Sequence, residues 1–387
     1  MDVHALRDLV AARADEFMAS LEAMVNVDCG SYTPSGVNRI ADLCERRFRD
    51  HGWEVDRRAH VPVEDEPQLG DLVIGTLRGA GGPKILLIGH MDTVFEDGTV
   101  AERPYRTGGG RAFGPGVSDM KGGLLAGFFA VQALQDAGFD SFDTITYVCN
   151  PDEEIGSPFS SSAIAELAPA HDAAFVLECA RASGAIVSAR KGVTDYVIAV
   201  HGRAAHAGVE PQKGRSAVLE AAHLTTALHG LNGRWPGVTV NVGSLHGGTR
   251  PNIVPDRAEL QVDVRSPELS TLQEAEREIE RLLETPTVPD VRIEVRSDGW
   301  HRPMEKTPAS ARLVELAVGV AAELGIPDVR DVATGGASDG NTISAAGTPT
   351  IDGLGPIGGG AHAPDEWLDL ASVVPRTALL AGLIARL

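Results

Sequence analysis

The chain has 387 residues, with 34 Lys and Arg against 54 Asp and Glu, so its formal net charge at pH 7 is −20. An acidic chain without a long basic run lacks the clustered cations that bind polyphosphates, which argues against nucleic acid as a partner and disfavours anionic membrane surfaces. Hydrophobic residues make up 43% of the chain, a value typical of globular proteins. The length exceeds what one core of ordinary size fills, so we expect two domains.

The sequence also bears on where the protein works. No apolar stretch reaches the length of a membrane span, and the first 25 residues carry charges at helical intervals, unlike a signal peptide. The four cysteines are too few and too widely spaced for a disulfide scaffold, which favours reduced thiols. We therefore expect a cytoplasmic protein without a membrane partner.

The N-terminal half alternates between helical and strand patterns. To about residue 60, apolar residues recur at intervals of three and four, which predicts helices. Short apolar runs typical of buried strands follow at 84–89, 144–149 and 174–177, and helical patterns lie between and after them at 122–137 and 160–168. This alternation predicts an α/β domain with an open, mostly parallel sheet and helices on both faces.

The pattern changes between residues 192 and 299. The expected order is strand, helix, strand, strand, helix and strand, at 193–201, 214–231, 238–245, 258–264, 271–283 and 291–295. This βαββαβ order is a recurrent two-layer α+β unit. Helix and strand patterns resume at 310–324, at 348–354 and from 372 onward. We therefore predict an α/β domain formed by residues 1–192 and 304–387, interrupted by an inserted α+β domain at 193–303.

Polar residues follow three of the expected strands in the first domain. They are His90 with Asp92, Glu153 with Glu154, and Glu178. Ligands of open α/β sheets bind beyond the carboxyl ends of the strands, so these groups converge on one crevice if the strands are neighbours. Asp119 before an expected helix and His362 after a strand pattern are further candidates. Each motif alone is weak, because acidic turns and His-x-Asp pairs are common on surfaces, but their co-occurrence indicates one site.

Two imidazoles and several carboxylates without interleaved Lys or Arg point to a divalent cation, which would offset the repulsion among the anions. Nitrogen and oxygen donors without cysteine suit Zn²⁺, with Mn²⁺ or Co²⁺ as substitutes, and argue against an all-oxygen Ca²⁺ or Mg²⁺ site. Five candidate ligands and one further glutamate favour two ions, because a carboxylate such as Asp119 can bridge them. Asp92 lies two residues beyond His90, where it can accept the second imidazole N–H and fix the tautomer.

Several stretches of the sequence resemble the co-catalytic metallopeptidases of the M20 family, and within it the glutamate carboxypeptidase branch. They are residues 89–94, 114–123, 150–157, 177–178, 202–208 and 360–362. The resemblance covers nearly the whole chain. It implies two zinc ions, with Asp119 as the bridge, His90 and Glu178 on one ion, and Glu154 and His362 on the other.

The resemblance implies further roles. Glu153 is similar to the general base of the family, and the peptide bond after Asp119 is expected to be cis. His206 resembles a histidine that reaches the active site of a partner subunit and binds the developing oxyanion, which implies a homodimer formed through the inserted domain, which also acts as a lid. Arg302 and Arg265 look like the family's substrate-carboxylate and inter-domain arginines. Asn252 matches a substrate-contacting asparagine.

These residues together predict a reaction. Glu153 can take a proton from a metal-activated water and return it to a leaving amine. Arg302 can grip an α-carboxylate bidentately, and a glutamate at 178 goes with carboxypeptidases and deacylases in the family rather than with aminopeptidases. We predict a dizinc amidohydrolase or carboxypeptidase that releases a C-terminal amino acid, with glutamate as a candidate, from a small amide or peptide.

Two alternatives stay open. The first is an N-acyl-amino-acid deacylase or dipeptidase, which would use the same metal chemistry with another pocket. The second is a non-catalytic metal-binding dimer. Structural zinc is usually saturated by four protein ligands and needs no spare carboxylate, so Glu153 beside Glu154 counts against the second alternative.

Overall fold

The structure is a computed structural model that describes residues 1–63, 65–327 and 329–387, with only the backbone described at 298–300. The chain divides into two compact units. The first consists of Met1–Ala189, Lys306–Ala333 and Ser338–Leu387, and the second of Arg190–Glu305 and Thr334–Ala337. All four cysteines are buried as free thiols. None of the helices in the described part of the chain has the length and apolar composition that a membrane span requires.

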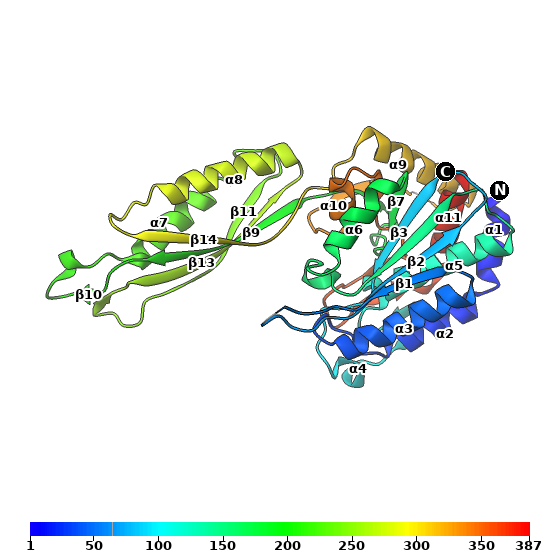
Figure 1. Cartoon of the computed structure of the whole chain (residues 1–387), viewed down its shortest axis with the longest axis horizontal. Coiled ribbons are helices and arrows are strands. Elements are labelled where there is room, and N and C mark those ends of the chain that lie inside the picture. The colour runs from blue at the N-terminus through cyan, green and yellow to red at the C-terminus, as the bar shows by residue number, and fades with distance from the viewer. Residues whose placement is uncertain (64, 328) are drawn as a thin grey trace. The chain divides into compact units, whose positions relative to one another are not determined.

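A six-stranded sheet forms the centre of the first unit (Figure 1), with the strand order β1-β2-β6-β3-β7-β16. The strands are β1 Glu54–Arg58, β2 Leu72–Arg78, β3 Lys84–His90, β6 Thr144–Asn150, β7 Ala173–Val176 and β16 Thr350–Ile351. β6, β3, β7 and β16 run parallel, whereas β1 and β2 are antiparallel to their neighbours. The mostly parallel sheet predicted from the sequence is therefore confirmed.

Helices cover both faces of this sheet, as Figure 1 shows. On β3, Ile85 and Leu87 pack on one face while Leu86 and Ile88 pack on the other. The first face is covered by α1 Val3–Ala11, α2 Ala14–Val25, α3 Pro34–Asp50, α5 Gly122–Asp136, α9 Pro308–Glu323 and α11 Leu370–Arg386, and the second by α6 Ser161–Leu167 and α10 Asp339–Ala345. Burial of each such aliphatic side chain contributes about 1.5–3 kcal/mol, which explains the continuous apolar runs of the parallel strands.

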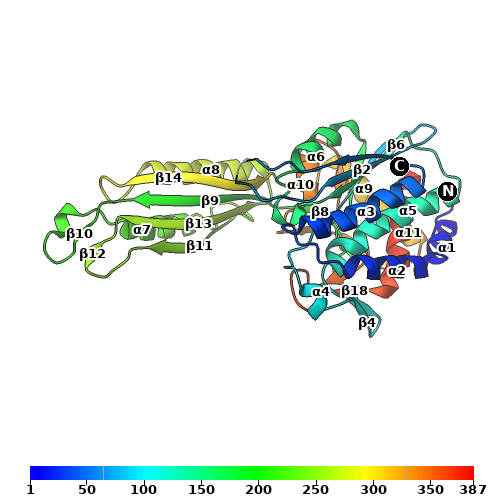
Figure 2. The same cartoon turned by 60° about the horizontal axis from the view of Figure 1, so that its bottom comes forward.

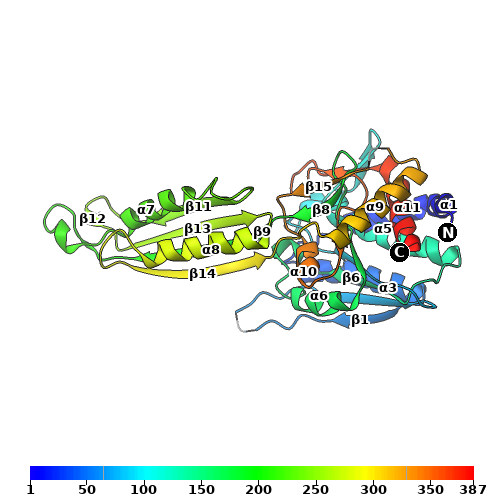
Figure 3. The same ribbon diagram turned by 90° about the horizontal axis from the view of Figure 1, so that it is seen from above.

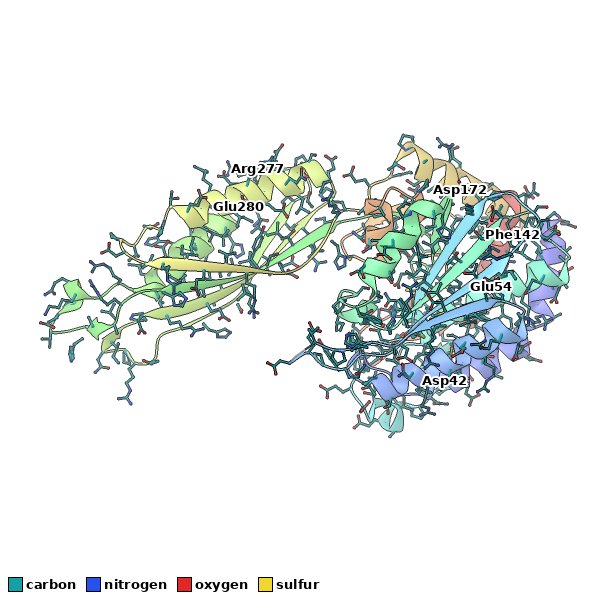
Figure 4. All side chains as sticks on the ribbon, viewed as in Figure 1. Asp42, Glu54, Phe142, Asp172, Arg277 and Glu280 are labelled. Atoms are coloured by element: carbon teal, nitrogen blue, oxygen red, sulfur yellow. The ribbon has the colours of Figure 1, made fainter. Side chains whose placement is uncertain are left out.

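The helical interpretation of the first 60 residues is wrong for its last part, because Glu54–Arg58 forms the edge strand β1. The charged residues of β1 form ion pairs with neighbouring elements. Arg57 donates to Asp42 on α3 at 2.6 Å, and Arg78 on β2 lies 3.2 Å from Glu54. Asp42 and Glu54 are labelled in Figure 4. A charged edge strand lacks the alternation of apolar and polar residues that identifies a strand in a sequence. Its charges also protect the edge of the sheet from pairing with another chain.

A smaller sheet brings distant segments of the first unit together. Its order is β17-β18-β5-β4, formed by β17 Gly358–Gly359, β18 Trp367–Asp369, β5 Arg111–Phe113 and β4 Arg106–Gly108. β18 and β4 are labelled in Figure 2, near the short helix α4 Thr99–Glu102. This sheet joins the glycine-rich segment before Asp119 to the hairpin that contains His362. The short strands β8 Ile186–Arg190 and β15 Asp331–Thr334 pair with each other.

The second unit has the predicted βαββαβ order. Its main elements are β9 Gly192–His201, α7 Ala217–His229, β11 Thr239–Gly247, β13 Arg257–Ser266, α8 Leu269–Glu284 and β14 Arg292–His301. The four strands form an antiparallel sheet in the order β11-β13-β9-β14, and both helices share one apolar core with it (Figure 3). Arg277 and Glu280 on α8 are exposed on the side away from that core (Figure 4). The short strands β10 Ala205–His206 and β12 Ile253–Val254 pair beyond the end of β9.

Candidate active site

The carboxyl ends of three neighbouring parallel strands carry the site. β3 pairs with both β6 and β7, which is the condition under which the sequence predicts one crevice. His90 is the last residue of β3. Glu153 and Glu154 lie in the turn Glu153–Ile155 after β6, and Glu178 follows β7 by two residues. The structure thus brings these four side chains to the same edge of the sheet.

Asp119 lies between the two histidines. It sits in the turn Val117–Lys121 before α5, and the peptide bond from Asp119 to Met120 is cis, as the family resemblance implies. Its Oδ1 is 3.2 Å from His90 Nε2, and its Oδ2 is 3.4 Å from His362 Nε2. One carboxylate therefore faces both imidazoles, one oxygen to each, which is the arrangement a bridging ligand needs.

The carboxylates of three glutamates complete the cluster. Glu178 Oε1 lies 3.6 Å from His90 Nε2, and Glu154 Oε2 lies 3.1 Å from His362 Nε2. Donor atoms of His90, Asp119 and Glu154 fall within 4.8 Å of one another, and the same holds for His90, Glu153 and Glu178. By the pair distances, each imidazole has a glutamate of its own beside it and Asp119 faces both imidazoles, while the two groups of donor atoms have His90 in common.

Asp92 organises the turn that carries the glutamates. Its buried carboxylate accepts the Ser31 hydroxyl at 2.6 Å and the backbone N–H groups of Glu153 and Glu154 at 3.2 and 3.1 Å. His90 Nδ1 is 3.0 Å from the main-chain oxygen of Asp92 and 3.4 Å from its carboxylate. The nearer acceptor for the imidazole is therefore the backbone of Asp92, while its carboxylate holds the neighbouring turn.

A buried polar network lies beneath this turn, and sequence reasoning did not identify it. Asn150 donates to Ser157 Oγ at 2.9 Å and to Asp339 at 2.6 Å, and Ser157 donates to Asp339 at 2.7 Å. Asp152 accepts the Ser160 hydroxyl at 2.6 Å, and burial raises its pKa to about 6. The small polar residues between 150 and 160 could have indicated such a network in the sequence. Nothing in the sequence around Asp339, at the start of α10, indicates that it takes part.

The excess of negative charge in the cluster raises the pKa of both imidazoles. Burial alone would lower the pKa of His90, but hydrogen bonds to Asp119 and Asp92 outweigh it and raise the pKa well above its ordinary value. Hydrogen bonds to Asp119 and Glu154 raise the pKa of His362 to about 10. Burial raises the pKa of Glu153 well above that of a free carboxyl group. The site therefore attracts positive charge strongly, in the form of protons or of metal ions.

A cavity of about 420 Å³ borders this cluster, because Glu154 and Ile155 form part of its wall. Tyr32, Val94 and Phe95 line it from two other loops. Tyr32 is 64% exposed, which is unusual for an aromatic side chain in a folded protein. The cavity thus offers apolar surface directly beside the polar groups.

The other predicted site residues lie in the second unit, at two ends of its sheet. His206 on β10 and Asn252 are exposed, and the backbone N–H of Ala207 donates to the main-chain oxygen of Asn252 at 3.0 Å. Arg265 and His301 both stand opposite Val193 near the start of β9, and the exposed Arg302 follows His301. From Val193 to His201, the last residue of β9, are eight residue steps, so about 27 Å of strand separates the arginine end from the end near His206.

Arg265 is engaged within its own unit. Its guanidinium lies 2.9 Å from Asp263 and donates to the main-chain oxygen of Gly335 at 2.9 Å. These contacts tie the segment Thr334–Ala337 to the sheet of the second unit. Arg265 therefore holds two segments together, and the side chain of Arg302 is exposed.

Comparisons with known proteins agree with this architecture. Residues 86–386 match Peptidase family M20/M25/M40. Carboxypeptidase G2 of Pseudomonas sp. (strain RS-16) is 29% identical over 381 residues, which cover 97% of this chain and 91% of that protein. Acetylornithine deacetylase of Edwardsiella ictaluri is 27% identical over 353 residues, 86% of this chain and 88% of that protein.

Solved structures share the fold. A tripeptidase from Staphylococcus aureus aligns with a TM-score of 0.79 and 20% identity over 97% of this chain and 99% of that one. An M20 family metallo-carboxypeptidase from Sulfolobus solfataricus aligns with a TM-score of 0.74 and 17% identity over 96% and 100%. With the family match spanning most of the sequence, the chain belongs to peptidase family M20/M25/M40 and is a hydrolytic enzyme.

Proposed function

We propose that the protein is a dizinc amidohydrolase of the carboxypeptidase type, which releases a C-terminal amino acid from an acyl or peptidyl amide. The observation that carries this proposal is the position of Asp119 between His90 and His362, with a glutamate beside each imidazole. Such an arrangement is expected of two metal sites that share one carboxylate.

The donor set fits the metal. His90 and Glu178 would hold one cation, Glu154 and His362 the other, and Asp119 both. Two imidazole nitrogens with carboxylate oxygens and no thiolate suit zinc, and Mn²⁺ or Co²⁺ can replace it in such sites. When bound, the two cations would polarise the scissile carbonyl and lower the pKa of a nearby water molecule.

Glu153 is the base in this proposal. It is the glutamate of the cluster that the ligand assignment leaves unused, and its carboxylate lies with those of the metal-binding group around His90. It takes the proton of the attacking water and returns it to the leaving amine. The Asp92 carboxylate supports this role because it holds the backbone N–H groups of both Glu153 and Glu154, which fixes their directions.

Arg302 binds the carboxylate of the departing amino acid in this proposal. An α-carboxylate calls for a planar pair of donors, and a guanidinium supplies them. Arg265 pairs with Asp263 and with the main chain of Gly335, and we assign it a positioning role within the second unit. Asn252 is too far along the sheet from these arginines to share their ligand within one subunit.

His206 acts from a partner subunit in this proposal. It lies with Asn252 beyond the end of β9, opposite to the end where β9 begins at Gly192 and β14 ends at His301, and about 27 Å of strand separates this end from Arg265. One substrate cannot contact both groups of the same chain at that spacing. A homodimer in which each inserted domain supplies His206 and Asn252 to the other subunit resolves this, and His206 then donates to the tetrahedral oxyanion.

The acyl portion of the substrate occupies the cavity beside Glu154. Its lining by Tyr32, Val94 and Phe95 favours an apolar or aromatic group. Glu96 and Asp97 also border it, and their charges disfavour an anionic acyl group. The enzyme would work in the cytoplasm on small, soluble amides.

A deacylase is the second candidate, because acetylornithine deacetylase is among the relatives of this chain. Incubation with an aroyl-glutamate, a set of dipeptides and N-acetyl amino acids, followed by mass spectrometry of the products, separates the candidates. Our proposal predicts that the aroyl-glutamate and related amides with a free α-carboxylate are cleaved fastest. Preferential cleavage of N-acetyl amino acids would identify a deacylase instead.

A further inference from the structure

Glu366 is a buried carboxylate next to the metal-binding cluster that sequence reasoning did not single out. It is 1% exposed and immediately precedes β18, in the hairpin that also carries His362. Its Oε2 accepts the backbone N–H of Gly116 at 2.8 Å. Its Oε1 accepts the backbone N–H groups of Ser118 and Asp119 at 2.8 and 3.0 Å, and the Ser118 hydroxyl at 3.2 Å. Four donors of one loop therefore converge on this single side chain.

The main-chain oxygens of the loop that precedes Asp119 are also bound. Lys121 is buried, and its Nζ donates to the main-chain oxygens of Pro115 and Val27 at 3.1 and 3.3 Å. Gly116 has a φ of +72°, and a Cβ there would lie 2.6 Å from Thr93 Cγ2. The backbone of residues 115–119 thus has little room to move, and an anion and a cation fix its N–H and C=O groups.

We propose that Glu366 is a positioning residue of the metal site, because it joins the loop of Asp119 to the hairpin of His362. These two ligands come from segments more than 240 residues apart, and yet Asp119 Oδ2 lies 3.4 Å from His362 Nε2. Glu366 binds the N–H of Asp119 itself and is four residues from His362 in the chain. This inference rests on the proposed function, in which both residues bind divalent cations.

The carboxylate form matters for this role. An amide in the same place has one acceptor oxygen, and its NH₂ group would face a backbone N–H, either that of Gly116 or those of Ser118 and Asp119. Glu366→Gln therefore loses at least one hydrogen bond, and its NH₂ group repels the backbone N–H group that it faces. The loop must shift to relieve this, and Asp119 shifts with it. Changes in residues that orient metal ligands typically lower metal affinity about 10–100-fold.

Glu220 offers a matched control. It is also a glutamate that is 1% exposed, and it accepts the backbone N–H groups of Thr287 and Val288 at 3.1 and 2.6 Å, in the second unit. Glu220→Gln therefore imposes the same chemical change on a buried loop anchor without touching the metal site. If both variants lose stability, the cause is the changed hydrogen bonding of a buried glutamate. If only Glu366→Gln loses metal affinity, the cause is the displaced metal ligand.

The test is a titration of metal-stripped, full-length protein with Co²⁺, followed by calorimetry and by the visible absorption of the bound ion. We expect Glu366→Gln to bind at least one of two Co²⁺ ions 10-fold or more weakly than wild type and to alter the absorption bands, while Glu220→Gln stays within about twofold. Wild-type affinity and spectrum in a folded Glu366→Gln protein would overturn the proposal.

A second variant covers the case in which Glu366→Gln does not fold. Glu366→Asp keeps the charge but withdraws it by one methylene, so Co²⁺ affinity should again fall severalfold, and an unchanged affinity would count against positioning. Failure of the proposed function is distinct, because it appears in the wild type as an absence of tight Co²⁺ binding or of amide hydrolysis. Failure of the present inference appears only in the variants.

Discussion

Glu153 and Glu154 are adjacent in the chain, but the structure gives them different neighbours. Glu154 lies 3.1 Å from His362, whereas Glu153 groups with His90 and Glu178. We expect Glu153→Gln to retain two metal ions per chain, because no proposed ligand is lost, and to lower kcat about 10²–10⁴-fold, because the proton of the water has no acceptor. Metal analysis by mass spectrometry together with steady-state kinetics checks this. Unchanged turnover with intact metal content would remove Glu153 from the role of base.

Single residues also show what the sequence can and cannot reveal. The clustering of His90, Glu154 and Glu178 could be predicted, because each lies at or after the carboxyl end of an apolar strand, where ligands bind in open α/β sheets. Glu366 and Asp339 could not, because the atoms they bind belong to segments about 180 to 250 residues away in the chain. A buried carboxylate has no local pattern, since its burial is decided by the tertiary fold alone.

At the scale of elements, the parallel strands were the most predictable part of the fold. β3 and β6 are buried on both faces, so their apolar runs are continuous and end close to the predicted positions. β1 has only charged side chains to stabilise it, apart from Val55, and α10 begins in a stretch rich in glycine and serine. Neither has the apolar period on which sequence reasoning depends, so both were missed.

His171 links α6 to the central sheet and gives a pH-dependent prediction. Its Nδ1 is 2.8 Å from the main-chain oxygen of Leu167 and its Nε2 is 2.9 Å from Thr146 Oγ1 on β6. Burial lowers the pKa of His171 below its ordinary value. The folded state then binds fewer protons than the unfolded state, so His171 costs stability as the pH falls below about 6.5.

We therefore expect His171→Gln to lose less thermal stability than wild type between pH 7 and pH 5. Melting temperatures at both pH values, for both proteins, give the comparison. The difference between the two proteins should be largest at pH 7, where the neutral imidazole makes both contacts. An identical loss of melting temperature in both proteins would show that His171 does not titrate in this range.

At the scale of the whole molecule, the proposed dimer predicts that each active site receives His206 from the other subunit. In the proposed dimer, a Glu153→Ala chain can lend its His206 to a His206→Ala chain, whose own Glu153 is intact. After random exchange, half of the dimers are mixed and each has one complete site, so activity should recover to about a quarter of that of wild type. Kinetics before and after mixing the two inactive proteins, with subunit exchange verified by native mass spectrometry, provides the measurement. Complete exchange without recovery would place His206 in its own subunit or outside the reaction.

The two-unit organisation follows from the sequence because each unit buries its own apolar core. We propose that the first unit gathers His90, Asp119, Glu154, Glu178 and His362 around two divalent cations that the reaction requires. Metal analysis of purified enzyme during stepwise removal by a chelator, with amide hydrolysis measured at each step, tests it most directly. We predict about two zinc ions per chain, loss of activity in step with their removal, and recovery on adding Zn²⁺ or Co²⁺. Full activity in metal-free protein would show that the reaction needs neither cation.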